Sequence, residues 1–188
     1  KSTPWLRKRI NKNKHKKPLE LIKCESGETI HYMGNPFTIH VSFSKKESIK
    51  IDNKILYLQT PFMDLNADHS QKRIQFLSKW FRQRAKDIIE DRVTIFSKLI
   101  NVSPKSIRIK QQKTRWGSCS AKGNLNFNWT LMMAPLPVLD YVIIHECCHL
   151  KHLNHSKAFW NLVSTYCLDF KQHKKWLKEK GYLLKIIA

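Results

Sequence analysis

Acidic residues are scarce in this sequence. Its 188 residues include 14 Asp or Glu against 35 Lys or Arg, which gives a formal net charge of +21. Such an excess of positive charge suggests a polyanionic neighbour, namely nucleic acid, an anionic membrane surface or an acidic protein. A Lys- and Asn-rich proteome produces the same balance, so the composition leaves both explanations open.

Long apolar runs and disulfide spacing are also missing. No segment approaches the roughly eighteen apolar residues of a transmembrane helix, so we expect no membrane span. No signal-peptide core is visible, although the sequence opens at Lys1. The five cysteines are an odd number, and two of them are adjacent. This usage excludes a disulfide framework and predicts a reducing, cytoplasmic location.

The chemistry of the chain is concentrated in one short motif, His145-Glu146-Cys147-Cys148-His149. Residues four apart share a helix face, so two imidazoles one turn apart can hold a single Zn²⁺. Glu146 projects from nearly the same side and can take a proton from a metal-bound water. The segment also has an apolar side, which indicates a packed helix beginning near Val138.

Three residues downstream compete to be the third ligand. His152 shares the helix face, but a straight helix carries it roughly 7.5 Å along the axis, too far to close a tetrahedral site. His155 can reach if the helix ends after Leu153, with Asn154 in a left-handed conformation. Asp169 is the rival, supplied by a second helix. We favour His145, His149 and His155, with water in the fourth position.

The spacing of the third histidine matches the metzincin pattern only in part. His152 stands where that pattern has glycine, and no methionine follows Met133 to build a Met-turn. The sequence therefore excludes a metzincin proper.

The rest of the chain predicts a β-rich part followed by helices. Residues 1–17 form a basic arm, residues 18–65 a β-rich N-terminal part and residues 66–188 the core of a single domain. Alternating patterns predict strands over 19–23, 29–33, 37–43, 48–51, 54–59, 106–112 and 124–129, with a hairpin at Gly34-Asn35 and a loop at Arg115–Ser120. Helical spacing predicts helices over 67–101, in one or two pieces, from Ser156 to Tyr166, and over 171–180.

Several side chains outside the motif have two possible roles. Arg115 either bonds backbone carbonyls or stabilises an oxyanion. Cys24 offers a thiol that could in principle cap a zinc ion. Cations on the long helix form either a solvated face or a surface for nucleic acid. These cations are Lys72, Arg73, Lys79, Arg82, Arg84 and Lys86.

About half of the chain resembles the YgjP-like zincin metallopeptidases, which are related to the SprT and WLM groups. The shared pieces are Arg115–Cys119, the Asn-containing strand, Leu131, Asp140-Tyr141, the HExxH motif, Asn154–Ser156 and Phe159-Trp160. The resemblance implies a zinc-dependent peptidase-like fold with His145, His149 and His155 as ligands and Glu146 as the catalytic base. It also implies an edge strand at Asn124–Asn128 that pairs with substrate, which makes Asn126 and Asn128 candidate substrate-binding residues. An ordinary sheet strand with solvent-facing Asn side chains is the open alternative. Arg115 is a third candidate substrate-binding residue.

These observations favour an α+β, zincin-like fold, in which a twisted sheet is backed by helices that include the HExxH helix. The expected function is a zinc-dependent hydrolase that cleaves peptide bonds in a protein or peptide substrate. Two alternatives stay open: a nucleic-acid-associated protease of the SprT type, and a basic nucleic-acid-binding protein whose zinc is only structural.

Overall fold

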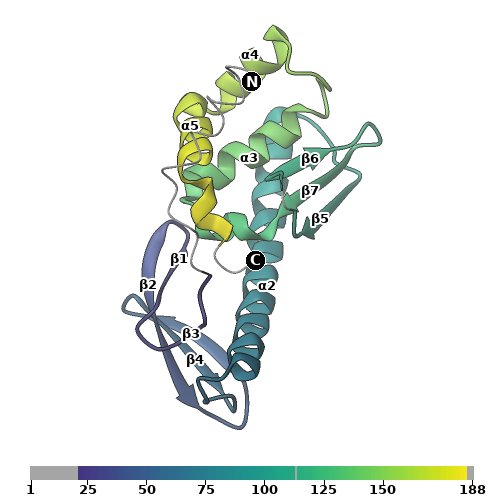
Figure 1. The fold of residues 1–188 in the computed structure, drawn as a ribbon. Coiled ribbons are helices and arrows are strands. Elements are labelled where there is room, and N and C mark those ends of the chain that lie inside the picture. Colours follow the sequence, from purple (N-terminus) through teal and green to yellow (C-terminus); the bar gives the residue numbers. More distant parts are fainter. Residues whose placement is uncertain (1–20, 113, 186–188) are drawn as a thin grey trace, which may run out of the picture.

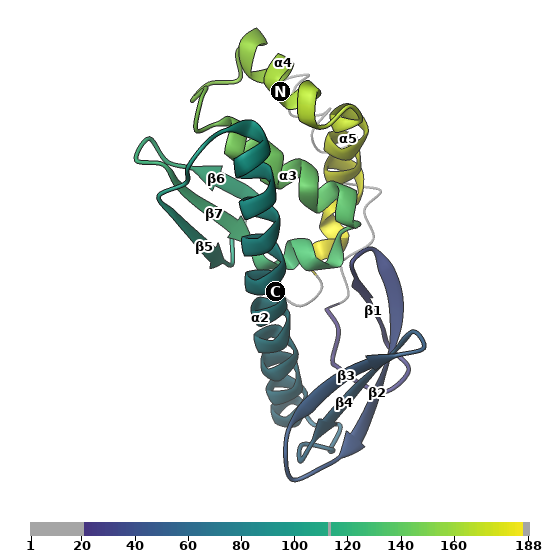
Figure 2. The same cartoon turned by 180° about the vertical axis from the view of Figure 1, so that it is seen from behind.

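The computed structural model describes residues 21–112 and 114–185, so the basic arm predicted at 1–17 lies outside the described residues. The α+β class is confirmed, but the strands form two sheets instead of one. A four-stranded sheet has the order β1-β2-β4-β3, and a three-stranded sheet has the order β5-β7-β6. A single long helix, α2, runs past both (Figures 1 and 2).

The N-terminal sheet contains β1 (Thr29–Tyr32), β2 (Asn35–Phe43), β3 (Ser48–Asp52) and β4 (Ile55–Thr60). The predicted hairpin is confirmed: β1 and β2 pair antiparallel around Met33 and Gly34, whose φ angles are 52° and 80°. The strand predicted over 19–23 is wrong for its described part. The amides of Lys23 and Glu25 donate to the Glu28 carboxylate, which takes the place of a neighbouring strand.

Helix α2 spans Ala67–Ile100 without a break, so the helix predicted over 67–101 forms one piece and not two. Asn66 caps its start by accepting a hydrogen bond from the His69 amide at 2.8 Å. Asn101 ends it in the left-handed region at φ 56°. Buried side chains recur along one face, which lets the helix join the N-terminal sheet to the rest of the molecule. These residues are Leu77, Phe81, Ala85, Ile89 and Val93.

One member of the predicted basic side of α2 is not on the surface. Arg73 is 1% exposed and donates to the backbone carbonyls of Cys24, Phe62 and Asp64 at 2.8–2.9 Å. Carbonyls in otherwise apolar surroundings need donors, and a guanidinium supplies several in one plane. Arg73 therefore links the segment before β1 and the β4–α2 loop to α2 by hydrogen bonds.

The second sheet contains β5 (Ser106–Lys110), β6 (Gly117–Cys119) and β7 (Asn124–Asn128). Strand β7 lies in the middle, parallel to β5 and antiparallel to β6. Two expectations fail here: Arg115–Ser120 is not wholly a loop, and β7 is not an edge strand. The short run Gly117–Cys119 has no alternating apolar pattern, so only its pairing with β7 identifies it as a strand.

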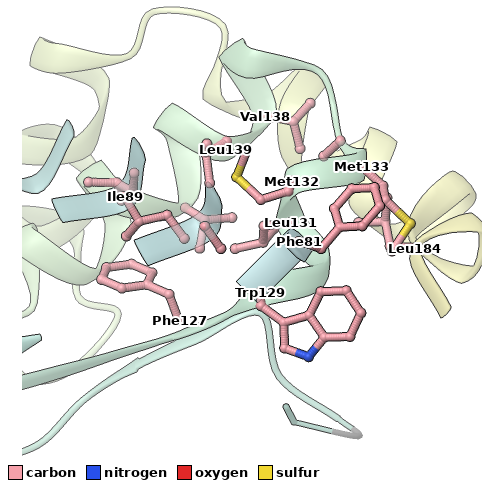
Figure 3. Close-up of a cluster of buried hydrophobic side chains, with 14 of the residues drawn as sticks. Phe81, Ile89, Phe127, Trp129, Leu131, Met132, Met133, Val138, Leu139 and Leu184 are labelled. Atoms are coloured by element: carbon pink, nitrogen blue, oxygen red, sulfur yellow. The ribbon is translucent and has the colours of Figure 1, made fainter. Parts of the chain in front are cut away.

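The main core lies between α2, the second sheet and the helices that follow. These are η1 (Trp129–Met133), α3 (Leu136–Cys148), α4 (Lys157–Tyr166), α5 (Phe170–Lys180) and η2 (Gly181–Lys185). Figure 3 shows Phe81 and Ile89 of α2 beside Phe127, Trp129 and Leu139. Arg92 of α2 forms a bidentate ion pair with Asp140 of α3, which orients the two helices. Within the described residues, no helix is long and apolar enough to cross a membrane.

Candidate metal centre

Helix α3 places the first two histidines of the motif. It begins at Leu136 after Pro135, close to the predicted start. It ends at Cys148, earlier than predicted, and Asn154 is not in the left-handed region. The amides of Leu150, Lys151 and His152 bond to the carbonyls of Cys147 and Cys148 instead, so the chain turns immediately after the motif. This early turn brings His155 back over the helix end.

Three imidazoles converge at this turn. The Nε2 atom of His145 lies 3.2 Å from Nε2 of His149 and 3.1 Å from Nε2 of His155. One nitrogen from each ring lies within 4.8 Å of the other two. Two nitrogens bound to a tetrahedral zinc ion at about 2.0–2.1 Å are about 3.3 Å apart. The three side chains therefore fit one metal ion, as predicted.

The ring orientation of His149 is set by the turn. Its Nδ1 atom lies 2.9 Å from the carbonyl oxygen of His152, which can only accept a hydrogen bond, so Nδ1 carries the proton. The lone pair is thereby left on Nε2, where a metal would bind. His152 thus takes part through its backbone, and its side chain is not in the cluster.

Burial favours the neutral form of His145 and His149. It lowers the pKa of His145 to about 3, with further contributions from the neighbouring His149 and His155, and it also lowers the pKa of His149. Neutral imidazole is the form that binds metal ions. The Nδ1 atom of His145 is buried and has no hydrogen-bond partner among the described residues. His145 and His149 therefore favour binding of a metal ion over binding of protons.

Aromatic side chains of α4 enclose the cluster. Ser156 caps this helix, as predicted, by accepting a hydrogen bond from the Phe159 amide. The cap places Phe159 against His149, with ring centroids 4.4 Å apart and an interplanar angle of 24°. Trp160 stacks on His155 at 5.5 Å and 21°. These contacts hold two of the three rings in place without using their Nε2 atoms.

Glu146 lies beside the histidines but faces β6. Its side chain is 5% exposed. A Cβ atom built on Gly117 would lie 2.7 Å from Glu146 Cγ and Oε1, so only glycine leaves room for this carboxylate. Burial raises the pKa of Glu146 to about 8, and the nearby positive charge of Arg115 partly offsets this shift. A bound dication would lower the pKa of Glu146 and so favour the ionised carboxylate.

A cleft of about 240 Å³ opens over His145 and Glu146. Its other lining residues are Arg115, Trp116, Gly117, Tyr141, Val142 and Leu177. Tyr141 precedes His145 by one helical turn, so its position next to His145 in the cleft could be predicted from the sequence. Leu177 comes from α5, and nothing in the local sequence connects that helix to the motif.

The alternative ligands are absent from the cluster. Asp169 is the residue before α5 and accepts a hydrogen bond from Gln172 at 3.0 Å. Cys24 is fully buried beside Arg73 in the N-terminal part. All five cysteines are free thiols.

The three candidate substrate-binding residues have different surroundings. Asn128 is 3% exposed, and its amide donates to the carbonyl of Gln112 while its oxygen accepts from the Thr130 amide, so it is a structural residue. Asn126 donates to Ser118 across the sheet. Arg115 is exposed and lines the cleft, and its guanidinium bonds to no carbonyl among the described residues. Since β7 is paired on both sides, it cannot receive a substrate strand.

Comparison with known proteins places this geometry in a family. The model of the YgjP-like metallopeptidase domain matches residues 1–180. Among solved structures, the metallopeptidase zymogen abylysin of Pyrococcus abyssi is 21% identical, covering 50% of this chain and 95% of its own, with a TM-score of 0.45. The zymogen jannalysin of Methanocaldococcus jannaschii is 26% identical, covering 50% and 96%, also with a TM-score of 0.45.

The search of curated proteins found no match. The family match spans nearly the whole chain and includes the three-histidine cluster, so this chain belongs to the YgjP-like metallopeptidase family.

Proposed function

We propose that this protein is a zinc-dependent peptidase in which His145, His149 and His155 hold the metal and Glu146 is the general base. The observation that carries the proposal is the convergence of three Nε2 atoms beside a buried carboxylate at one end of a cleft. Imidazoles bind several transition metals, but three of them with an open fourth position are typical of catalytic zinc. Water or substrate would take that position.

Each group in the cleft has a separate role in hydrolysis. When bound, the zinc ion supplies a Lewis acid that polarises the peptide carbonyl and acidifies water. Glu146 accepts the proton of the attacking water and returns it to the leaving amine. The rings of His149 and His155 are held by the His152 carbonyl and by Trp160, so they need no rearrangement. Leu177 and Tyr141 keep the opposite wall apolar.

The outer edge of β6 is the proposed binding site for the substrate backbone, in place of β7. The carbonyl of Trp116 accepts from the Asn128 amide, and the Ser120 amide donates to the Asn124 carbonyl. Because antiparallel pairs alternate, Gly117 and Cys119 direct their backbone groups away from β7. An extended peptide can therefore add to this edge directly beside Glu146.

Replacing Gly117 with alanine should lower kcat at least tenfold while zinc stays bound. The new methyl group occupies the space of the Glu146 side chain, and a displaced general base loses part of its roughly 10²- to 10⁴-fold contribution. The measurement is kcat together with zinc content by elemental analysis. Ser118→Ala is the matched control, since successive strand residues face opposite sides and Ser118 points away from Glu146. Unchanged kcat in Gly117→Ala would contradict the proposed position of Glu146.

Removal and restoration of the metal test the function as a whole. The purified chain, loaded with one equivalent of zinc, should cleave a mixture of quenched fluorescent peptides. A chelator should abolish cleavage, and stoichiometric zinc should restore it. Cleavage that persists in metal-free protein would refute the proposal. A zinc-loaded chain that cleaves no peptide and no unfolded protein would also refute it.

A further inference from the structure

The segments around the cleft carry several cations. Residues 114–123, 149–157 and 169–180 surround the metal cluster from β6, from the loop between α3 and α4, and from α5. Together they hold nine Lys or Arg residues and two acidic residues, Asp169 and Glu179. Helix α3, which also lines the cleft, adds Asp140 and Glu146 and no Lys or Arg, so the balance becomes nine to four, close to the 35 to 14 of the whole chain. The positions of individual cations, and not their number, distinguish the site.

Two of these cations lie near the catalytic groups, one on the β6 side of the cleft and one on α5. Arg115 lines the cleft beside Glu146 on the β6 side, and its side chain is exposed. Lys174 belongs to α5, and its Nζ atom lies 4.2 Å from the centroid of the Trp160 ring, which in turn stacks on His155. Both charges are therefore close to the place where a scissile bond would lie.

The electrostatic surroundings of the catalytic residues agree with this geometry. Glu146 is the only acidic side chain among the described residues that line the cleft. A substrate carboxylate entering here meets the positive charge of Arg115 in the cleft and that of Lys174 nearby.

We infer that this peptidase selects acidic peptides, with Asp or Glu within about two residues of the scissile bond on either side. Arg115 and Lys174 are the specificity-determining residues for these carboxylates. This inference rests on the proposed function and adds the substrate class to it. Positive charges at the rim of a site attract acidic substrates and repel basic ones, and so discriminate between them.

Three quenched fluorescent peptides test the inference. They share one length and one neutral core, and carry Glu, Gln or Lys on both sides of it. With the zinc-loaded chain at low salt, kcat/KM should be about five- to tenfold higher for the Glu peptide than for the Gln peptide, and lowest for the Lys peptide. The difference should shrink at about 1 M salt because the Debye length falls to about 3 Å.

Two substitutions on α5 separate a local effect from net charge. Lys174→Glu should remove most of the preference for the Glu peptide. Lys175→Glu changes the net charge equally, but this residue lies about 160° around the helix from Leu177, whereas Lys174 lies about 60° from it. The control variant should keep the preference of the parent. Equal effects of both substitutions would overturn the role of Lys174.

Binding provides a readout that does not depend on turnover. In the Glu146→Gln background, fluorescence anisotropy should show tighter binding of the labelled Glu peptide than of the Gln peptide, with and without zinc. Cleavage of all three peptides at similar rates would overturn the inference alone and leave the peptidase intact. Failure of the zinc-loaded chain to cleave any of them would overturn the proposed function and the inference together. Tighter binding of a single-stranded oligonucleotide that displaces the Glu peptide would assign the charges to nucleic acid instead.

Discussion

Replacing Glu146 with glutamine should lower kcat by about 10²- to 10⁴-fold without loss of zinc, because a general base contributes an acceleration of this size. The amide keeps the shape of the carboxylate and still fits the space opposite Gly117, so the fold and the three histidines should be undisturbed. An amide cannot accept the proton of the attacking water. The measurements are kcat on a fluorescent peptide and the zinc content of the same preparation.

The control for this experiment is Glu47→Gln, which makes the same chemical change at an exposed site in the turn between β2 and β3. Its kcat should equal that of the parent chain. A Glu146→Gln variant that retains full activity would show that another group takes the proton. A variant that loses both activity and zinc would show that Glu146 supports the metal site, and the assignment as general base would lose its support.

Replacing His149 or His155 with alanine should remove zinc from the protein. Each variant leaves two imidazoles, and the loss of affinity should exceed the roughly 10- to 100-fold effect of removing an outer-sphere partner. Activity should fall to background in both. Elemental analysis and competition with a fluorescent chelator measure the two quantities directly. The cluster shows no fourth protein ligand among the described residues that could compensate.

His152→Ala is the matched control for the ligand variants. This histidine lies between the two ligands in sequence, but the contact to His149 Nδ1 comes from its backbone carbonyl, which alanine preserves. Zinc should therefore remain bound with nearly unchanged affinity. Loss of zinc in His152→Ala, with zinc retained in His155→Ala, would mean that the third ligand has been assigned to the wrong histidine. Zinc retained in His155→Ala but lost in Asp169→Asn would identify Asp169 as the ligand.

Most of the candidate metal site follows from local sequence. Two histidines four residues apart lie on one face of any α-helix, so His145 and His149 converge without help from the rest of the fold. The serine before α4 caps that helix through its own side chain, and the hairpin at Gly34 depends on residues within the turn. Such features need only neighbours a few residues away. For this reason they could be predicted from the order of the amino acids.

Residue spacing predicts His155 as the third ligand, but it does not predict the turn that brings this residue to the cluster. His155 was the favoured ligand, yet the turn that delivers it differs from the expected one. The helix ends at Cys148 and not after Leu153, and in the turn that follows the carbonyl of His152 contacts the His149 ring. Residue spacing establishes which side chains can reach a common point. It does not establish the path that the backbone takes between them.

Long-range packing decided the remaining features. Arg73 had the pattern of a surface cation, but three backbone carbonyls from distant segments surround it. Gly117–Cys119 had the appearance of a loop and is an edge strand, while the more strand-like Asn124–Asn128 lies in the sheet centre. Leu177 reaches the cleft only because α5 packs on α3. Side-chain periodicity reports which face of a segment is buried, but strand order and helix contacts depend on partners far along the chain, and only the folded structure brings those partners together.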